Sequence, residues 1–308
     1  MLKKNWDTGF LQEIPDEVLK DRMDIFLLAN SRILGAIIQG TTMVNQMRAN
    51  HELGIIETLA LGHAYLAAGL LTRSLTGEER ILLQIDSSGP LGGLTAEANA
   101  HGEIRGYLKN KSLDITAPVN SFNLAPFLGI GFLKITKYLK RLKQPFTGQV
   151  VLQTSNLAED LAYYFRTSEQ IPTAFHLSIK FDREGRVTGA GGLLLQALPG
   201  TDQELLDDLT NTVQGLPSLG NLLEAGMDCT SILQHYFISY NSELLAHNPV
   251  QFYCHCSKEH FGGYLVSLPV SELEDMLEKG PFPIVITCHN CNSTYEYGKE
   301  EIRAMLMH

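Results

Sequence analysis

Four of the five cysteines lie near the C-terminal end of the chain, where they form two closely spaced pairs. Cys254 and Cys256 make a C-x-C pair, and Cys288 and Cys291 make a C-x-x-C pair. Two pairs of soft ligands brought together by folding make the tetrahedral thiolate cage that zinc prefers, with one ion per chain. The same sulfurs could pair as two disulfides if the metal left. The predicted site therefore has two chemically distinct states and can act as a switch.

A structural zinc ribbon, permanently closed, is the simpler interpretation of such a site. Two features favour the switch. A C-x-C pair is less common in structural sites and would close a strained, reducible ring on oxidation. Thiolates are also the form of cysteine that oxidants attack. Because residues 247–308 are too few to bury much apolar surface, a bound metal would supply much of their folding free energy.

Three further residues have side chains that could take part in the chemistry. His255 and His289 lie inside the two cysteine motifs. Four cysteines already complete a tetrahedron, so we expect both histidines to lie outside the ligand set, beside the metal or exposed. Cys229, the fifth cysteine, is expected to be a free and partly buried thiol without a redox role.

Composition limits the partners and the compartment. The formal net charge of the 308 residues is −10, which disfavours non-specific binding to nucleic acid or to an anionic membrane. The N-terminal residues do not resemble a signal peptide, and an odd cysteine number with four in metal-like pairs favours a reducing compartment. We therefore expect a cytoplasmic protein. The most apolar stretch, residues 55–71, is predicted to be a buried amphipathic helix.

Enzyme motifs do not account for the chain. His51-Glu52 is not followed by the second histidine of a zinc protease helix, and the sequence has no P-loop. The zinc deaminase signature requires proline before the cysteine pair, whereas Thr287 stands there. The glycine clusters at 129–131 and 189–192 lack dinucleotide-binding spacing and are predicted to be turns or close-packing positions. We expect no catalytic residues.

The segments that must position the site combine the helical and the alternating strand periodicity of apolar residues. This mixture predicts an α+β fold. Residues 21–48 read as mostly helical, entered from a short strand-like run at 26–28. Residues 53–74 and 156–166 read as helices, the latter capped by Asn156, and 80–86 and 148–153 as strands. Hairpins are predicted over 94–108, turned at His101-Gly102, and over 175–196, turned at 182–185.

Three units follow from these patterns: an α+β core domain (1–198), a helical linker (199–246) and a small zinc-binding domain (247–308). The pattern from 201 to about 245 is wholly helical but is cut into short pieces by glycine and proline. Short helices need tertiary contacts to persist, so this segment is either a conditionally folded linker or an ordinary helical connector. Within the third unit, a capping box at Ser271 is expected to begin a helix that Gly280-Pro281 ends. Strands over 283–287 and 293–297 should flank the second cysteine pair.

Several motifs together resemble one family. The run Ser88 to Asn99 followed by Arg105-Gly-Tyr107, the run Ala158 to Phe165 followed by Ser168-Glu-Gln170, and Ala190 to Gln196 resemble the core domain of the thirty-three-kilodalton chaperonins. These bacterial heat-shock proteins are redox-activated holdases. Phe252 to Ser257 and Thr287 to Asn292 resemble the family's switch domain, with all four cysteines present. Gly92 departs from many relatives, which carry a basic or bulkier residue there.

The resemblance implies a mechanism that composition and spacing do not. Oxidation would form Cys254–Cys256 and Cys288–Cys291 disulfides and release zinc. The linker would then unfold, and the activated form would dimerise and hold unfolding client proteins against aggregation.

Two other functions are compatible with paired cysteines. A zinc-ribbon adaptor for nucleic acid should carry a basic face, but residues 247–308 carry four basic against eight acidic side chains. A thiol oxidoreductase should turn over a dithiol substrate, and its C-x-x-C pair should open a helix in a βαβ unit rather than follow a strand.

Overall fold

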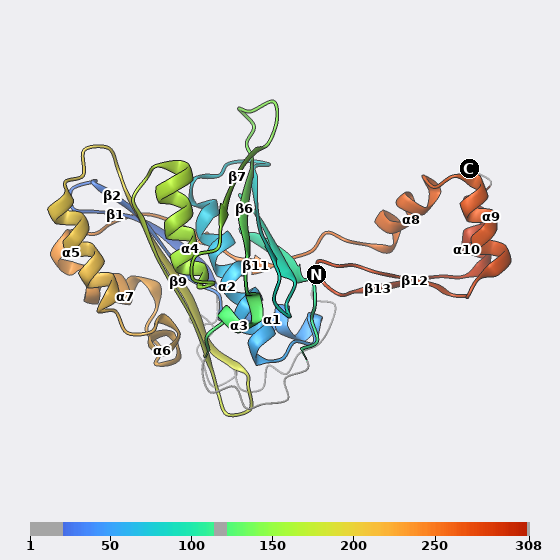
Figure 1. The fold of residues 1–308 in the computed structure, drawn as a ribbon, viewed down its shortest axis with the longest axis horizontal. Coiled ribbons are helices and arrows are strands. Elements are labelled where there is room, and N and C mark those ends of the chain that lie inside the picture. Colours follow the sequence, from blue (N-terminus) through green and yellow to red (C-terminus); the bar gives the residue numbers. More distant parts are fainter. Residues whose placement is uncertain (1–20, 114–121, 307–308) are drawn as a thin grey trace.

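The computed structural model describes residues 21–113 and 122–306, and it confirms the mixed α+β class. Figure 1 shows a layered body from which the C-terminal segment extends to one side. The strands are β1 (Arg22–Leu28), β2 (Ile33–Gln39), β3 (Arg80–Ser87), β4 (Gly93–Asn99), β5 (Glu103–Leu108), β6 (Gly131–Tyr138), β7 (Phe146–Val151), β8 (Thr173–Phe181), β9 (Val187–Ala197), β10 (Glu243–Pro249), β11 (Gln251–Phe252), β12 (Ile284–Thr287) and β13 (Thr294–Tyr297). The helices are α1 (Thr41–His51), α2 (Ile55–Leu71), α3 (Ala125–Leu128), α4 (Leu157–Tyr164), α5 (Gln203–Gln214), α6 (Leu219–Glu224), α7 (Cys229–Tyr236), α8 (Lys258–Val266), α9 (Val270–Lys279) and α10 (Lys299–Met305).

Two sheets sandwich helix α2. Sheet A has the strand order β10-β1-β2-β9-β8, and sheet B has the order β11-β5-β4-β3-β6-β7. Helix α2 contacts strands of both sheets, so nearly all of its residues are buried. The predicted burial is therefore confirmed, but the helix is not amphipathic, because it has no face directed to water. Within the described ranges, the stretch Ile55–Ser74 alone has the length and composition of a membrane span, and 89% of its most apolar window is buried inside the fold.

Several predicted elements form as expected. The hairpins β4–β5 and β8–β9 pair in antiparallel register, and Asn156 caps α4 by accepting hydrogen bonds from the backbone N–H groups of Ala158 and Glu159. The helix after Pro269 also forms and ends at Gly280, but it begins at Val270 without a side-chain cap. The predicted capping box at Ser271 is therefore wrong.

Two expected helical stretches are strands instead. Residues 22–39 form the hairpin β1–β2, and a helix begins only at Thr41. Sheet A is covered on both faces, so its strands carry near-continuous apolar runs that imitate a helical pattern. Nearer the C-terminus, residues 243–249 form β10, which pairs with β1 at the sheet edge. The sequence pattern predicts helix to about Leu245, so the prediction is wrong for the start of this strand. This strand ties the linker to the core, and the expected boundary at 246/247 falls within it.

The linker helices cover the outer face of sheet A. Leu219, Leu222 and Leu223 of α6 and Ile232 and Leu233 of α7 are buried in one apolar cluster with side chains of β1, β2 and β9. None of these helices exceeds 12 residues. Isolated helices shorter than about 12–15 residues are marginal in water, so their order depends on this contact with the sheet.

Close backbone packing fixes α6 on the sheet. A Cβ atom on Gly189 of β9 would lie 2.0 Å from the carbonyl oxygen of Gly220, and the backbone N–H of Gly220 donates to Ser178 Oγ at 3.1 Å. The glycine cluster at 189–192 is thus a close-packing position, as predicted from the sequence.

This contact can be tested with a pair of substitutions. Gly189→Ala should push α6 away from sheet A and destabilise the protein by about 1–3 kcal/mol, the usual cost of overpacking. Hydrogen exchange should accelerate in residues 219–236 more than in sheet B. The control is Gly263→Ala, because a Cβ at Gly263 in α8 would meet nothing within 4 Å. Unchanged exchange in α6 would contradict the proposed role of this contact.

Candidate metal centre

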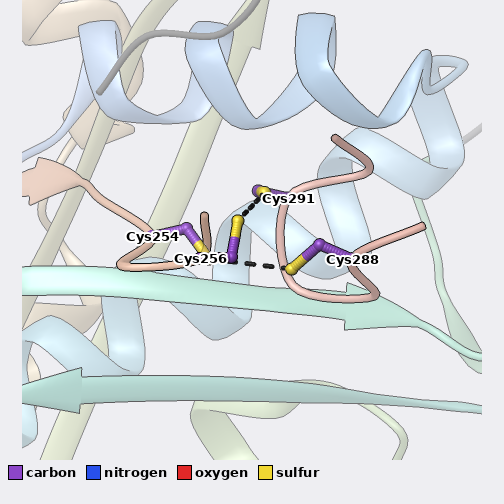
Figure 2. A group of neighbouring side chains, drawn as sticks. All are labelled: Cys254, Cys256, Cys288 and Cys291. Atoms are coloured by element: carbon purple, nitrogen blue, oxygen red, sulfur yellow. Dashed lines mark hydrogen bonds between the residues drawn. The ribbon is translucent and has the colours of Figure 1, made fainter. Parts of the chain in front are cut away.

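The four cysteine sulfurs converge from two loops. Cys254 and Cys256 follow β11, and Cys288 and Cys291 lie in the turn that joins β12 to β13. All four side chains are buried, and their Sγ atoms lie within 4.8 Å of one another. Figure 2 shows the side chains pointing toward a common centre, with the contacts Cys254–Cys288 at 3.8 Å and Cys256–Cys291 at 3.2 Å. The Cys288–Cys291 pair thus lies on a turn between two strands, as the sequence predicted, and the Cys254–Cys256 pair lies in a loop after a strand end.

The dimensions of this cluster fit zinc. A tetrahedral ion with Zn–S bonds of about 2.3 Å holds its sulfurs about 3.8 Å apart. The Cys254–Cys288 separation of 3.8 Å matches that edge, and the Cys256–Cys291 separation of 3.2 Å is shorter than it. Within the described residues, His255 and His289 stand outside the cluster of possible ligands, and both are exposed. His255 pairs instead with Glu103, at 2.7 Å between Nε2 and Oε2.

The electrostatics of the sulfurs also call for a cation. Hydrogen bonds from Cys288 and Cys291 lower the pKa of the Cys254 thiol far below its usual value. Hydrogen bonding to Cys254 raises the pKa of both Cys288 and Cys291 in turn. The first thiolate therefore forms easily, and the others form only against its negative charge. Burying four thiolates together requires a positive ion among them.

The core domain supplies neighbours to the sulfurs. The guanidinium of Arg105 on β5 lies 4.0 Å from Cys254 Sγ and also bonds Glu97 at 2.8 Å. Burial by itself would lower the pKa of Arg105, but the charges of Glu97 and Cys254 raise it overall. Since Zn²⁺ with four thiolates keeps a net charge of about −2, this cation is placed to offset part of it. Within the C-terminal segment, the Tyr295 hydroxyl lies 3.2 Å from Cys256 Sγ.

The second cysteine loop is bound to the end of helix α1. His51 Nε2 lies 3.2 Å from the carbonyl oxygen of Asn290, to which it must donate. The side-chain amide of Asn292 donates to the carbonyl oxygen of Asn50 at 3.0 Å, and Lys111 Nζ donates to Asn292 Oδ1 at 2.8 Å. Burial lowers the pKa of His51 to about 4, so the imidazole is neutral near pH 7.

The two cysteine loops and helices α8–α10 belong to different apolar clusters. The four cysteines lie in the main core cluster, together with Val250 and Phe252. Helices α8–α10 and the β12–β13 hairpin enclose a small cluster of their own around Leu265, Leu273, Tyr297 and Ile302. In Figure 1 the hairpin runs from the core to these helices, which lie at its far end. The candidate metal centre therefore lies where the C-terminal segment meets the core.

The fifth cysteine lies far from this centre in the fold. Cys229 begins α7 and is fully buried against sheet A, with an exposed fraction of 0%. Burial raises the pKa of its thiol well above the usual value, and the neighbouring Asp24 carboxylate adds to that effect. It is a free thiol, as expected, but it is wholly rather than partly buried.

A family model described as Hsp33 protein matches residues 21–298. The chain belongs to the Hsp33 family. It is 36% identical over 279 residues to the 33 kDa chaperonin of Desulforamulus reducens, covering 90% of this chain and 93% of the relative. It is 33% identical over 280 residues to the 33 kDa chaperonin of Lachnoclostridium phytofermentans, covering 90% and 95%.

A solved structure agrees with this assignment. The crystal structure of the 33 kDa chaperonin (heat shock protein 33 homolog) of Thermotoga maritima superposes with a TM-score of 0.82 at 30% identity, covering 93% of this chain and 98% of the other. The family resemblance drawn from the sequence motifs is confirmed, and with it a chaperone function. Membership of this chaperone family also fits the expectation that the chain is not an enzyme.

Sequence reasoning missed the core residues at the centre. His51, Asn50 and Lys111 lie far from the cysteines in the chain, and only folding brings them together. Arg105 was noted as part of a motif, but nothing in its spacing pointed to Cys254.

A substitution at His51 tests whether the core helps to retain the metal. His51→Gln should release zinc to a chelator about tenfold faster at pH 7.5, since removing a residue that orients a ligand loop usually costs 10–100-fold in affinity. The neutral imidazole stabilises docking fully above its unfolded pKa of 6.5, and this stability falls as the pH drops toward the folded pKa of about 4. As the pH falls from 6.5 to about 4, the zinc release rate should therefore rise less steeply in the variant than in the unsubstituted protein.

His255→Gln is the matched control. Its ring pairs with Glu103 at the surface, where ion pairs contribute little, so its release rate should stay within about twofold of the unsubstituted protein. Equal effects of the two substitutions would contradict a specific role for His51.

Proposed function

We propose that the chain is a redox-regulated holdase, zinc-bound and inactive when reduced. Cys254, Cys256, Cys288 and Cys291 are the proposed ligands of one Zn²⁺ ion. The observation that carries the proposal is the convergence of four buried sulfurs, at zinc-like spacing, where the C-terminal segment meets the core of a chaperone-family fold. Zinc would hold the sulfurs as thiolates, which are the form that oxidants attack.

Oxidation is proposed to form Cys254–Cys256 and Cys288–Cys291 disulfides. Each bond joins two thiolate sulfurs, and its two electrons pass to an oxidant of the peroxide class, which is reduced to water as protons are taken up. Loss of all four ligands frees the metal. In the reduced structure the measured sulfur contacts run between the loops, from Cys254 to Cys288 and from Cys256 to Cys291.

The pairing matters for the outcome. Disulfides between the loops would keep them tied together, whereas disulfides within each loop leave the loops free to separate. Only the second arrangement opens the centre. The pairing within each loop is the one that the family resemblance implies.

The linker is proposed to open because β10 and β11 connect it to the metal loops. Arg22 of β1 bonds Asp228 at 3.0 Å and Thr230 at 3.2 Å, at the start of α7, and His247 of β10 bonds the buried Asp24 at 2.7 Å. Disturbing β10 would thus weaken the attachment of α7. Release of α5–α7 would uncover the apolar side chains that now lie between them and sheet A.

The remaining features of the proposal follow the family. Unfolded or partly folded proteins are the clients, the activated form is a homodimer, and the reducing cytoplasm is the compartment. Neither nucleic acid nor a membrane is a proposed partner. The proposed functional units are the core (1–198), the linker (199–246) and the switch domain (247–308). Strand β10 crosses the boundary between the linker and the switch domain and pairs with β1 of sheet A.

Aggregation of a thermally unfolding client tests this function directly. The zinc-loaded chain should give little protection, and the peroxide-treated chain should suppress aggregation with release of one zinc per chain, measured with a metal-binding dye. Cys229→Ala is the control and should keep the oxidation response, because its thiol lies outside the cluster. Protection that does not depend on oxidation would contradict the switch, and turnover of a small dithiol substrate would favour a thiol oxidoreductase.

The order of oxidation gives a second test. Cys288–Cys291 should form before Cys254–Cys256, because a C-x-x-C ring closes with less strain than a C-x-C ring. Metal-bound sulfurs are all thiolates, so the low pKa of Cys254 in the metal-free cluster does not decide the order. The order can be measured by treating the protein with increasing peroxide, alkylating the remaining thiols and identifying the peptides by mass spectrometry. Loss of the Cys254 and Cys256 thiols before those of Cys288 and Cys291 would refute the predicted order.

A further inference from the structure

The residues that lead into the first cysteine pair cover the edge of sheet B. Strand β11 pairs in parallel with β5, which would otherwise be the outermost strand. The backbone N–H of Gln251 donates to the carbonyl oxygen of Gly102 at 2.9 Å, and that of Tyr253 donates to the carbonyl oxygen of Ile104 at 3.0 Å. The chain thus places its own segment on this edge in the manner of an added strand.

Side chains of this segment alternate between two environments. Val250, Phe252, Cys254 and Cys256 are 4%, 5%, 4% and 9% exposed, whereas Gln251 and His255 between them are exposed. The Phe252 ring stacks on Tyr65 of α2, with ring centroids 6.3 Å apart and planes 13° apart. The β5 edge therefore offers backbone hydrogen bonds together with apolar sites for every second side chain of an extended strand.

A metal bound by the two cysteine loops would hold residues 250–256 on the β5 edge. The ladder between β11 and β5 is only two residues long, and the next buried positions along the chain are Cys254 and Cys256. Without the metal, the segment would keep its two backbone hydrogen bonds, the side chains of Val250 and Phe252 and the His255–Glu103 pair. A Cys254–Cys256 disulfide, however, would pull two alternate positions closer together than an extended strand allows, which favours release of the segment from the edge. Its departure would leave β5 as an edge strand with unpaired N–H and C=O groups beside an apolar site at Tyr65.

We propose that the β5 edge, once uncovered, binds an extended segment of an unfolding client in the place of residues 250–256. This inference rests on the proposed redox function and identifies a binding surface for it. The preferred segment has apolar side chains at alternate positions, with an aromatic one where Phe252 lies. A basic residue three positions later is favoured, since His255 now pairs with Glu103 at 2.7 Å. Folded proteins keep such strands paired internally, so the edge selects unfolded chains.

A peptide with the sequence of residues 247–256, carrying serine at both cysteine positions and a fluorescent label, is the probe. Full-length protein is used in its zinc-loaded reduced form and in its oxidised form. The peptide should bind only the oxidised form. A version with serine in place of the phenylalanine should bind at least tenfold more weakly, as expected when a buried aromatic contact is lost.

The decisive control keeps the composition and changes the register. Exchanging the glutamine and phenylalanine of the peptide moves the aromatic ring to the outward face, so binding should fall by a similar factor. Equal binding of the exchanged peptide would overturn the inference.

Hydrogen exchange locates the site. Residues 99–108 should lose protection on oxidation and regain it when the peptide is added, and excess peptide should reduce aggregation suppression. Protection confined to residues 203–240 would overturn the assignment to β5. Conversion of an activated dimer to monomer by the peptide would overturn it as well, by assigning the edge to a second copy of the chain.

The experimental outcomes distinguish the proposed redox function from the proposed binding surface on β5. Failure of the oxidised chain to suppress aggregation would remove the proposed function and this inference with it. Suppression that persists undiminished in excess peptide would remove the β5 assignment and leave the redox function intact.

Discussion

The arrangement of the C-terminal segment depends on one electrostatic constraint, that four thiolates cannot be buried side by side without a cation. The opposed pKa shifts of Cys254, Cys288 and Cys291 express this repulsion. Protonation relieves it in a metal-free cluster, and a bound metal or neutral disulfides would relieve it without protons on the sulfurs. Because the sulfurs lie in the main core cluster, a change between these forms would, under the proposed function, also loosen the two loops from α1 and β5. A metal bound there would act mainly on this attachment, whereas the distal helices pack around an apolar cluster of their own.

Under the proposed function, two separate apolar surfaces depend on that attachment. One lies under the linker helices on sheet A, and the other lies under β11 at the edge of sheet B. They are connected through residues 241–250, which run from the linker along β1 and on to β5. A local change at the sulfurs can therefore reach distant parts of the chain by way of a single edge strand. This route differs from direct docking of the linker on the metal domain, because the linker helices pack on sheet A.

The sequence was sufficient to predict the convergence of the four cysteines and insufficient for their surroundings. Cysteine spacing and flanking β-propensity are local signals, so the four sulfurs and the β12–β13 turn could be predicted. The hairpin β1–β2 was misread as mostly helical, because strands covered on both faces lose their alternation. Strand β10 was missed because an exposed edge strand has little apolar pattern of its own. His51 and Arg105 could not be predicted as neighbours of the sulfurs, because their proximity is a property of the tertiary fold.

Cys229 gives the molecule a reporter of its own conformation. Its thiol is fully enclosed between α7 and sheet A, in a setting that raises its pKa, and it takes no part in the metal cluster. An alkylating reagent can reach it only while α7 is lifted. Its labelling rate is consequently an internal gauge of linker opening, independent of how many of the other four sulfurs have reacted.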